Sequence, residues 1–290
     1  MQINWNSWIE NGGEAKWKPL RQAIHIVLMS ISKCESLKDH MMLKGGILMA
    51  LCYDSSRYTR DIDFSQKEKY QQGDENKLLN ELNSAIQETV EEMDYGLDCK
   101  IQSHELRPRN QTNPTFPTLK LKIGYAYKHD HANHRRLAQK QATTVVEIDF
   151  SFNETTKSAE EFNISDGNVL LRYSLVDLMA EKFRALLQQE VRKRNRRQDI
   201  YDILHLLKNF PKQIEGIKPD LLEALIQSTS SKELEINPES MNEGKIREMS
   251  KQEYNQLEAE VANGTLVDFD IAYEKVTNFY KSLPWDNQQH

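Results

Sequence analysis

The fold of this chain is decided by two short stretches, LKGG at residues 43–46 and RYTRDIDF at residues 57–64. Their pattern predicts a strand, a tight glycine turn, an apolar helix and a second strand, in that order. Because alternate residues of a strand share a face, Asp61 and Asp63 point to the same side. Two carboxylates so close repel each other unless a cation lies between them, and a hard divalent ion such as Mg²⁺ or Mn²⁺ suits oxygen ligands. The pair therefore predicts a metal site.

The glycine turn predicts a second part of the same site. Gly45 and Gly46 come at the start of a helix, where bare backbone N–H groups bind anions such as phosphate. Alone, a Gly-Gly pair is usually only a turn, and an Asp-x-Asp pair is common on solvated strand edges. The two in this order and at this spacing indicate a nucleotide held through its phosphates and a metal ion, which is what nucleotidyl transfer requires.

A third carboxylate lies on a further predicted strand, residues 143–152. The second half of this strand alternates strictly, so that Glu147 and Asp149 share its polar face. If it lies beside the first acidic strand, Asp149 completes a set of three with Asp61 and Asp63. It would then act as a metal ligand or as the general base on an incoming hydroxyl. The alternative is a solvated residue on the outer face of a half-buried strand.

These residues carry a family resemblance, and a second block supports it. Residues 44–63, with the pattern KGG and RxTxDID, and residues 178–203, with LxxEKxxAL, a basic stretch and RQDIYDI, resemble the AbiEii/AbiGii toxin family. That family belongs to the DNA polymerase β-like nucleotidyltransferase superfamily. The resemblance covers roughly residues 40–210. It implies an NTP-dependent toxin, often encoded beside an antitoxin, and some relatives transfer nucleotides to tRNA.

The resemblance also implies roles for individual residues. Lys44 would join the glycine turn in binding the nucleotide, and Lys182 and Arg60 would supply positive charge to the triphosphate. The chain departs from the family at one position. Ile47 stands where the family has Thr or Ser directly after the glycines, so its side chain offers no hydroxyl to a phosphate.

Lys182 lies near the core-facing stripe of a predicted helix, residues 174–189. A lysine there must reach water or find an anion. Its ammonium would either stabilise the charge that develops on the leaving pyrophosphate or form a salt bridge to an acid such as Asp199. Asp199 and Asp202 lie at the start of the next helix, where an acid has either a catalytic role or the ordinary role of capping the helix. Asp199 is the stronger catalytic candidate of the two.

The predicted elements form an α+β fold of two domains. The resemblance implies a polymerase β-like nucleotidyltransferase domain with a mixed sheet, which we place at residues 1–165. An α-helical domain at residues 166–290 would complete the nucleotide cleft. In this second domain, residues 251–262 and 268–283 have the periodicity of amphipathic helices.

Charge is distributed unevenly along the chain. The 290 residues carry a net charge of −6 with a pI near 5.8, which excludes a basic surface overall. Residues 192–197 nevertheless hold five cations in six positions, which indicates contact with RNA or a triphosphate, or a solvated linker between two helices. Residues 128–140 predict a long polar loop with His129, His131 and His134, for which zinc binding, acceptor binding and a plain surface loop are the alternatives.

The cysteines and the hydropathy indicate the compartment. Cys34, Cys52 and Cys99 are widely spaced, which favours reduced thiols in a cytoplasm over a disulfide framework or a zinc site. No apolar run approaches the roughly 20 residues of a membrane span, and the first residues lack the pattern of a secretion signal. We therefore expect a cytoplasmic protein without a membrane partner.

Three functions of different classes are consistent with these features. The first is a metal-dependent nucleotidyltransferase, the toxin of a toxin–antitoxin or phage-defence (abortive infection) system, which transfers NMP from an NTP to a hydroxyl of RNA, tRNA in particular, or of protein. The second is a catalytically idle fold that binds NTP or nucleic acid as a regulator, which Ile47 favours and the three acids oppose. The third is a sugar-nucleotide transferase, in which the glycine turn would have no role.

Overall fold

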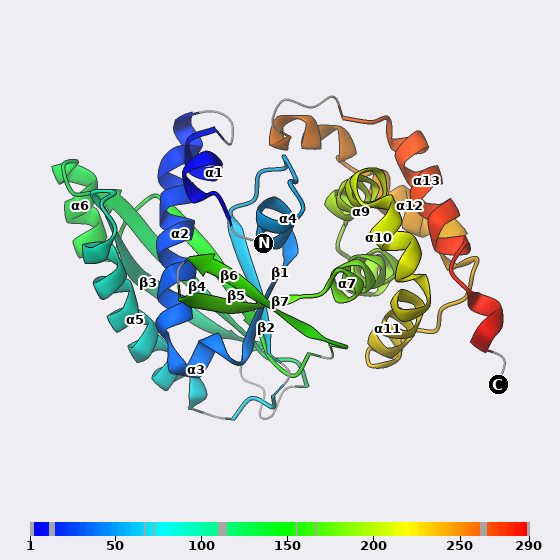
Figure 1. Cartoon of the computed structure of the whole chain (residues 1–290), viewed down its shortest axis with the longest axis horizontal. Coiled ribbons are helices and arrows are strands. Elements are labelled where there is room, and N and C mark those ends of the chain that lie inside the picture. Colours follow the sequence, from blue (N-terminus) through cyan, green and yellow to red (C-terminus); the bar gives the residue numbers. More distant parts are fainter. Residues whose placement is uncertain are drawn as a thin grey trace. The chain divides into compact units, whose positions relative to one another are not determined.

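The structure of the chain is a computed structural model that describes residues 3–11, 15–66, 68–71, 73–109, 115–154, 156–165, 167–261 and 266–288. The chain forms two compact units (Figure 1). The sheet unit comprises residues 1–54, 58–154 and 159–172, and the helical unit comprises residues 55–57, 155–158 and 173–290. Each unit has its own set of buried apolar side chains.

The sheet unit is built on one mixed sheet, which among the described residues has seven strands in the order β3-β4-β5-β2-β1-β7-β6. The strands are β1 (Met41–Lys44), β2 (Asp61–Gln66), β3 (Leu97–Arg107), β4 (Thr118–Tyr127), β5 (Val145–Ser151), β6 (Ala159–Ser165) and β7 (Asn168–Tyr173). β2 runs parallel to β5, and β1 runs parallel to β7. The pairs β1–β2, β3–β4 and β4–β5 are antiparallel, so the predicted α+β fold with a mixed sheet is confirmed.

Alternation of side chains determines which face of β2 and of β5 joins the core. Val146, Ile148 and Phe150 of β5 are buried, and the residues between them are half-buried. β2 alternates over its first four residues, with Ile62 and Phe64 buried, and Phe64 stacks on Phe150 with the ring centroids 5.4 Å apart. The apolar faces of both strands thus join one core, which leaves their acidic residues on the opposite face.

Helices cover the sheet. They are α1 (Trp5–Asn11), η1 (Ala15–Trp17), α2 (Lys18–Lys33), α3 (Glu35–Lys38), α4 (Gly45–Cys52), α5 (Asp74–Glu92) and α6 (His131–Ala138). α2 and α5 pack on each other and on β3, and α4 packs on β1 and β2 (Figure 1). Every residue of α2 from 20 to 32 is buried, so α2 is a central helix of the unit rather than a half-exposed one.

Helix α6 corrects the loop that the sequence predicts over residues 128–140. Asp130 caps this helix, because its Oδ1 accepts a hydrogen bond of 3.1 Å from the backbone N–H of Asn133. Leu137 is buried, and α6 packs on β3 and β4. The polar composition of the segment concealed a short capped helix that covers the sheet with a single apolar side chain.

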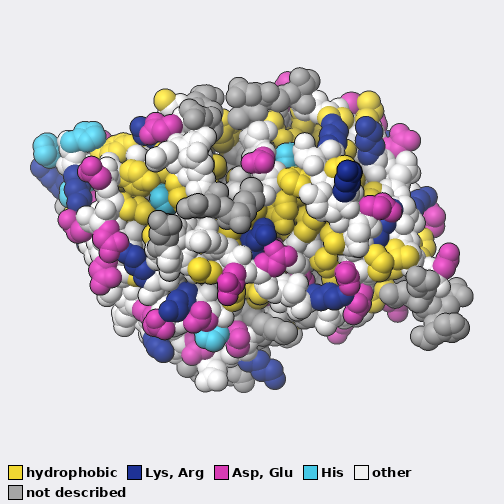
Figure 2. Space-filling view, in the orientation of Figure 1, with side chains coloured by type: hydrophobic (Ala, Val, Ile, Leu, Met, Phe, Trp, Pro, Cys, Tyr) yellow, Lys and Arg dark blue, Asp and Glu magenta, His cyan; other side chains and the backbone are white. Residues whose placement is uncertain are grey.

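Histidine side chains gather at the α6 end of the sheet unit, with basic side chains beside them (Figure 2). His134 Nε2 lies 2.9 Å from Asp98, and His129 stacks on Tyr127 with the ring centroids 5.0 Å apart. No group of three metal-ligating side chains occurs in the part of the chain that the structure describes. These two histidines therefore have partners of their own, and the structure supplies no preformed zinc site around them.

The helical unit consists of short helices. They are α7 (Leu175–Leu187), α8 (Gln189–Arg192), α9 (Arg197–Asn209), α10 (Pro211–Gly216), α11 (Lys218–Ser230), η2 (Ser240–Asn242), α12 (Gly244–Lys251), η3 (Tyr254–Glu260), α13 (Phe269–Lys281) and η4 (Trp285–Gln288). α7 packs on α9 and α11, and α9 packs on α13. Ser174 caps α7, since its hydroxyl accepts a hydrogen bond of 3.1 Å from the backbone N–H of Asp177. The helix predicted at 268–283 is confirmed as α13. The one predicted at 251–262 is wrong: α12 ends at Lys251, residues 254–260 form the 3₁₀ helix η3, and residue 262 lies outside the described residues.

The cysteines are free thiols, and all three are buried. Burial raises the pKa of the Cys34 thiol to about 12 and that of the Cys52 thiol to about 11, so both are protonated at neutral pH. Among the described helices, none combines the length and the apolar character that crossing a bilayer requires.

Candidate active site

The acidic residues of β2 and β5 lie side by side on one face of the sheet. In the parallel pairing of these strands Asp63 lies opposite Asp149, and Asp61 lies opposite Glu147. Asp61 is exposed, whereas Asp63 and Asp149 are half-buried. The predicted neighbourhood of the two strands is therefore present: the strand that carries Asp149 lies beside the strand of the acidic pair.

The glycine turn lies against one of these carboxylates, that of Asp63. Gly45 has φ +69°, and a Cβ added to it would lie 2.2 Å from Asp63 Oδ2. The Asp63 carboxylate thus fills the space that a side chain at position 45 would need, and only glycine fits there. Lys44 is buried and lies opposite Asp63 in the antiparallel β1–β2 pair. A helix start, a lysine and a carboxylate are therefore neighbours at one point of the sheet.

We expect Gly45→Ala to displace the Asp63 carboxylate and to weaken binding of a divalent cation. Alanine in the left-handed region also costs about 1–2 kcal/mol of stability. Gly96→Ala is the matched control, because Gly96 has φ +61° but nothing within 4 Å of the added Cβ. Urea unfolding should show backbone strain in both variants, and calorimetric titration with Mn²⁺ should show weaker binding in Gly45→Ala alone. Equal Mn²⁺ affinities in the two variants would contradict the expected link between the turn and the carboxylate.

Two lysines of β4 face the acids of β5, and neither is among the residues predicted for the site. Lys120 Nζ lies 2.8 Å from Oδ1 and 2.5 Å from Oδ2 of Asp149, and Lys122 Nζ lies 3.0 Å from Glu147. A signal for them was present in the sequence. The lysines alternate with buried residues in β4 as the acids do in β5, and antiparallel neighbours with that alternation bring oppositely charged side chains together.

The donor set fits a divalent cation at Asp61 and Asp63, with Asp149 as a ligand that must change partners. A phosphate at the glycine turn would meet the Asp63 carboxylate, and a cation between the two anions removes their repulsion. Among the described residues no three acidic, histidine or cysteine side chains already surround one point. Because Lys120 binds both carboxylate oxygens of Asp149, Asp149 can join the other two acids only by releasing Lys120.

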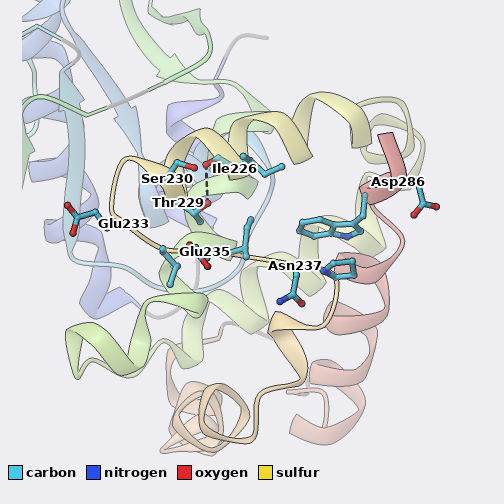
Figure 3. Close-up of a pocket in the computed structure, with 11 residues that line it drawn as sticks. Ile226, Thr229, Ser230, Glu233, Glu235, Asn237 and Asp286 are labelled. Atoms are coloured by element: carbon cyan, nitrogen blue, oxygen red, sulfur yellow. Dashed lines mark hydrogen bonds between the residues drawn. The ribbon is translucent and has the colours of Figure 1, made fainter. Parts of the chain in front are cut away.

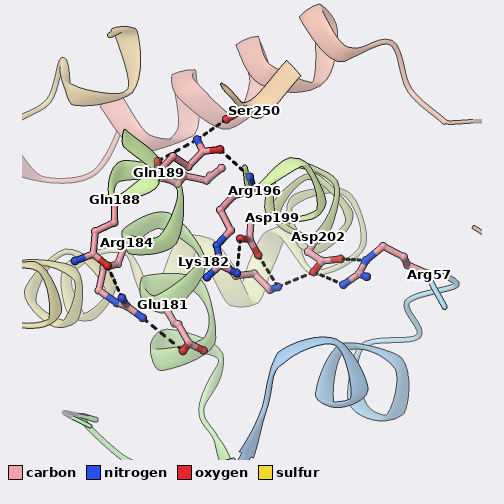
Figure 4. Close-up of polar contacts among 11 residues, drawn as sticks. Arg57, Glu181, Lys182, Arg184, Gln188, Gln189, Arg196, Asp199, Asp202 and Ser250 are labelled. Atoms are coloured by element: carbon pink, nitrogen blue, oxygen red, sulfur yellow. Dashed lines mark hydrogen bonds and ion pairs between the residues drawn. The ribbon is translucent and has the colours of Figure 1, made fainter. Parts of the chain in front are cut away.

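A buried ionic network lies in the helical unit and contains Lys182 and Asp199 (Figure 4). Arg57 donates two hydrogen bonds to Asp202, from Nε and Nη2, each 3.0 Å long. Lys182 Nζ lies 2.6 Å from Asp202 Oδ2 and 3.3 Å from Asp199 Oδ1. Asp202, Lys182 and Asp199 are all buried. The salt bridge that was the alternative explanation for Lys182 is therefore present, and it involves two acids rather than one.

Charge pairing keeps this network ionised in spite of its burial. Burial alone acts to raise the pKa of Asp202, but the charges of Arg57 and Lys182 outweigh it, so the pKa of Asp202 lies below its usual range. Burial likewise acts to lower the pKa of Lys182, but the charges of Asp202 and Asp199 outweigh it and the pKa is raised. Asp202, rather than the Asp199 favoured by the sequence, is thus the centre of the network.

The other residues predicted for the site divide between surface and core. Ile47 is buried, so its side chain belongs to the core of the sheet unit and offers nothing to a ligand at the turn. Arg60 is exposed. In the basic run at residues 192–197, Arg197 pairs with Glu253 and Glu260, whereas the first part of the run is exposed.

A pocket of about 750 Å³ in the helical unit lies between the end of α11 and η4 (Figure 3). Pro238 and Trp285 contribute to its apolar wall, and Glu233 and Glu235 to its polar wall. None of the described residues that line it is a lysine or an arginine, and none belongs to the predicted nucleotide site. Its acidic lining is unsuited to phosphate, so this pocket is not the predicted nucleotide site.

The fold of the chain is that of nucleotidyltransferases. The chain is similar to MenT4, a nucleotidyltransferase toxin from Mycobacterium tuberculosis, with a TM-score of 0.55 and 13% identity over 95% of this chain and 88% of that one. It is also similar to JHP933 from Helicobacter pylori, with a TM-score of 0.54 and 15% identity over 96% of each chain. At these identities the likeness concerns the fold alone. No curated protein matches the chain.

The sequence shows the family. The model of the nucleotidyl transferase AbiEii toxin family, described as a type IV toxin–antitoxin system, matches residues 27–275. This chain therefore belongs to the AbiEii nucleotidyltransferase toxin family, and the predicted family and enzyme class are confirmed.

Proposed function

We propose that this nucleotidyltransferase is metal-dependent and transfers NMP from an NTP to a hydroxyl group of RNA, most specifically of tRNA. The observation that carries the proposal is the register of the central strands, which sets Asp63 opposite Asp149 and against the glycine turn. A bound Mg²⁺ or Mn²⁺ would neutralise phosphate charge and lower the pKa of the attacking hydroxyl. Asp61, Asp63 and Asp149 are the residues that would hold it.

The proposed reaction is an in-line substitution at the α-phosphorus of the NTP. The backbone N–H groups of Gly45 and Gly46 bind phosphate oxygens, and Lys44 and Arg60 add positive charge. The acceptor oxygen forms the new P–O bond, the α–β bridging P–O bond breaks, and pyrophosphate leaves. Asp149, once it has released Lys120, accepts the hydroxyl proton if it does not serve as a ligand.

Lys182 and Asp199 keep a separate place in the proposal. Binding of the triphosphate by Lys182 requires its ammonium to exchange a buried carboxylate for a phosphate, because Asp202 and Asp199 hold it in the structure. That role therefore stays a prediction, as does a catalytic role for Asp199. Their contribution to the stability of the helical unit rests directly on the ion pairs.

The biological setting is part of the proposal. The family is described as one of toxins in type IV toxin–antitoxin systems, and MenT4 is a nucleotidyltransferase toxin. We propose that this chain likewise acts as a cytoplasmic toxin with a cognate antitoxin, in phage defence by abortive infection. Modification of a tRNA end would block translation, which is an effect suited to such a toxin.

Transfer of label tests the reaction and the acceptor together. Purified full-length protein is incubated with Mg²⁺, total tRNA and each α-labelled NTP in turn, and the products are separated on denaturing gels. Label on tRNA with one NTP preferred is the expected result. Label on the protein instead would overturn the RNA acceptor. Nucleotide binding without transfer to any acceptor would overturn the proposed reaction in favour of a catalytically idle regulator.

A further inference from the structure

A column of aromatic rings and cations lies in the sheet unit, and one of its members, Arg60, directly precedes the acidic pair in the chain. Trp17, the last residue of η1, stacks on Tyr58 with the ring centroids 5.2 Å apart and the planes inclined by 22°. Arg60 Cζ lies 5.0 Å from the centre of the Trp17 ring. Arg60 is exposed and immediately precedes Asp61, so the outer end of the column lies next to the candidate active site in the chain.

The inner end of the column is a buried arginine. Arg21 Cζ lies 5.7 Å from the ring of Tyr58 and 5.9 Å from that of Trp8. Arg21 is 5% exposed and donates one hydrogen bond, from Nη1 to the carbonyl oxygen of Ile9. Its Nη2 has no hydrogen-bond partner, and no carboxylate of the described residues pairs with it. A buried guanidinium left without an anion is costly and calls for an explanation.

Packing alone explains the ring stacking but not the charges. Cation–π contacts stabilise such pairs only modestly at exposed sites. They leave the positive charge of Arg21 and Arg60 uncompensated, because neither forms an ion pair with an acid in the described part of the chain. In a protein with a net charge of −6, such a concentration of unpaired cations on aromatic rings is what a ligand with flat rings and negative charge would need.

We propose that Trp17, Tyr58 and Arg60 form a platform on which an unpaired nucleobase of the substrate stacks. Nucleobases stack on aromatic rings and on arginine planes, and the accompanying phosphate supplies an anion for the exposed Arg60. Because Arg60 lies exposed over Trp17, a base can stack on its guanidinium plane or take its place on the indole. The ligand is a base with its phosphate, supplied by the end of a single-stranded RNA or by a free NTP. This inference rests on the proposed nucleotidyl transfer.

Binding measurements on the full-length chain test the platform separately from catalysis. The probes are a fluorescein-labelled single-stranded RNA dodecamer, the same sequence as a duplex, and unlabelled NTPs followed by calorimetry. Trp17→Leu removes the ring, and Trp17→Phe keeps one. Arg60→Gln removes the exposed charge, and Arg247→Gln is its matched control. Arg247 is an exposed arginine whose Cζ lies 6.0 Å from the ring of Phe269 in the helical unit.

We expect Trp17→Leu to weaken binding of single-stranded RNA or of NTP roughly tenfold, as loss of one base-stacking contact does elsewhere, and Trp17→Phe to weaken it less. Arg60→Gln should weaken binding and lower the slope of log affinity against log salt by about one, because one phosphate contact is lost. Duplex RNA should bind weakly and respond little to Trp17. If only NTP binding is weakened, the base that stacks on the platform is that of the incoming nucleotide. If only RNA binding is weakened, it is a base of the acceptor.

The platform is overturned if Arg60→Gln binds the single-stranded RNA and the NTPs with the same affinities as Arg247→Gln does. It is also overturned if Trp17→Leu, shown to be folded by its thermal transition, binds as the native chain does. Failure of the proposed reaction has a different signature: binding that depends on Trp17 and Arg60, with no label transferred to RNA. Transfer that proceeds unchanged in both variants would leave the reaction standing and refute the platform.

Discussion

Asp63→Asn is expected to reduce nucleotidyl transfer by at least about a thousandfold while leaving the fold intact. In the proposed site Asp63 supplies charge to the cation and lies against the glycine turn, where a Cβ on residue 45 would approach it to 2.2 Å. Metal-assisted stabilisation of the transition state is worth several kcal/mol, and each 1.4 kcal/mol is a factor of about ten in rate. Asparagine keeps the shape of the side chain, so the decrease in the transfer rate measures the contribution of the negative charge. The initial rate of label transfer measures it.

Glu147→Gln is the matched control for this substitution. Glu147 lies opposite Asp61 on the same face of the sheet, but it pairs with Lys122 and has no part in the proposed site. We expect its rate to stay within about threefold of the native rate, because a surface ion pair contributes at most about 1 kcal/mol. If Asp63→Asn retained activity comparable to that of Glu147→Gln, the acidic pair would not be the metal site.

Asp202→Asn is expected to lower the free energy of unfolding by about 3–5 kcal/mol, because it removes the carboxylate that binds the buried Lys182 and the largely buried Arg57. Asp202 is fully buried and accepts hydrogen bonds from both cations. Asp220→Asn is the matched control, since Asp220 pairs with Lys157 at 2.7 Å but has 57% of its side chain exposed. That substitution should cost less than about 1 kcal/mol. Urea unfolding of the three proteins gives the comparison, and equal stabilities would contradict the importance of the network.

The effect of Asp202 should also depend on pH in a definite direction. Its pKa in the folded chain lies below the ordinary value, so its contribution to stability is present above the unfolded pKa of about 3.9 and is lost as pH falls towards the folded value. The difference in unfolding free energy between the native chain and Asp202→Asn should therefore be constant near neutrality and shrink below about pH 4. A difference that instead grew on acidification would show that the carboxylate is protonated in the folded state.

Much of the sheet was predictable because its determinants are local. Strict alternation in β5, and alternation over the first four residues of β2, defines which side chains face the core. The turn between β1 and α4 requires glycine at a left-handed position. Helix α6 was missed for an equally local reason. Its polar composition gives no apolar stripe, and the cap by Asp130 and the single buried Leu137 carry too little signal to separate a short helix from a loop.

The partners of charged side chains were the part least open to prediction. Lys120 and Asp149 are 29 residues apart in the chain, and Arg57 and Asp202 are 145 apart. Strand pairing brings the first pair together, and the packing of the helical unit brings the second. By sequence, Asp202 resembles any acid near the start of a helix. Nothing in the sequence indicates that the guanidinium of Arg57 contacts it.

The sequence by itself determined the chemistry that this chain can offer: a glycine turn, an acidic pair on one strand, a third acid on another, and membership in a family of nucleotidyltransferases. Those features depend on side-chain periodicity and on residue type, both of which are local. Only the tertiary structure decided which charged side chains contact each other. It set Asp63 opposite Asp149, gave Lys120 to Asp149, and enclosed Lys182 between two carboxylates. Coulombic and hydrogen-bonding energies depend on distance and burial, and folding alone sets those two quantities.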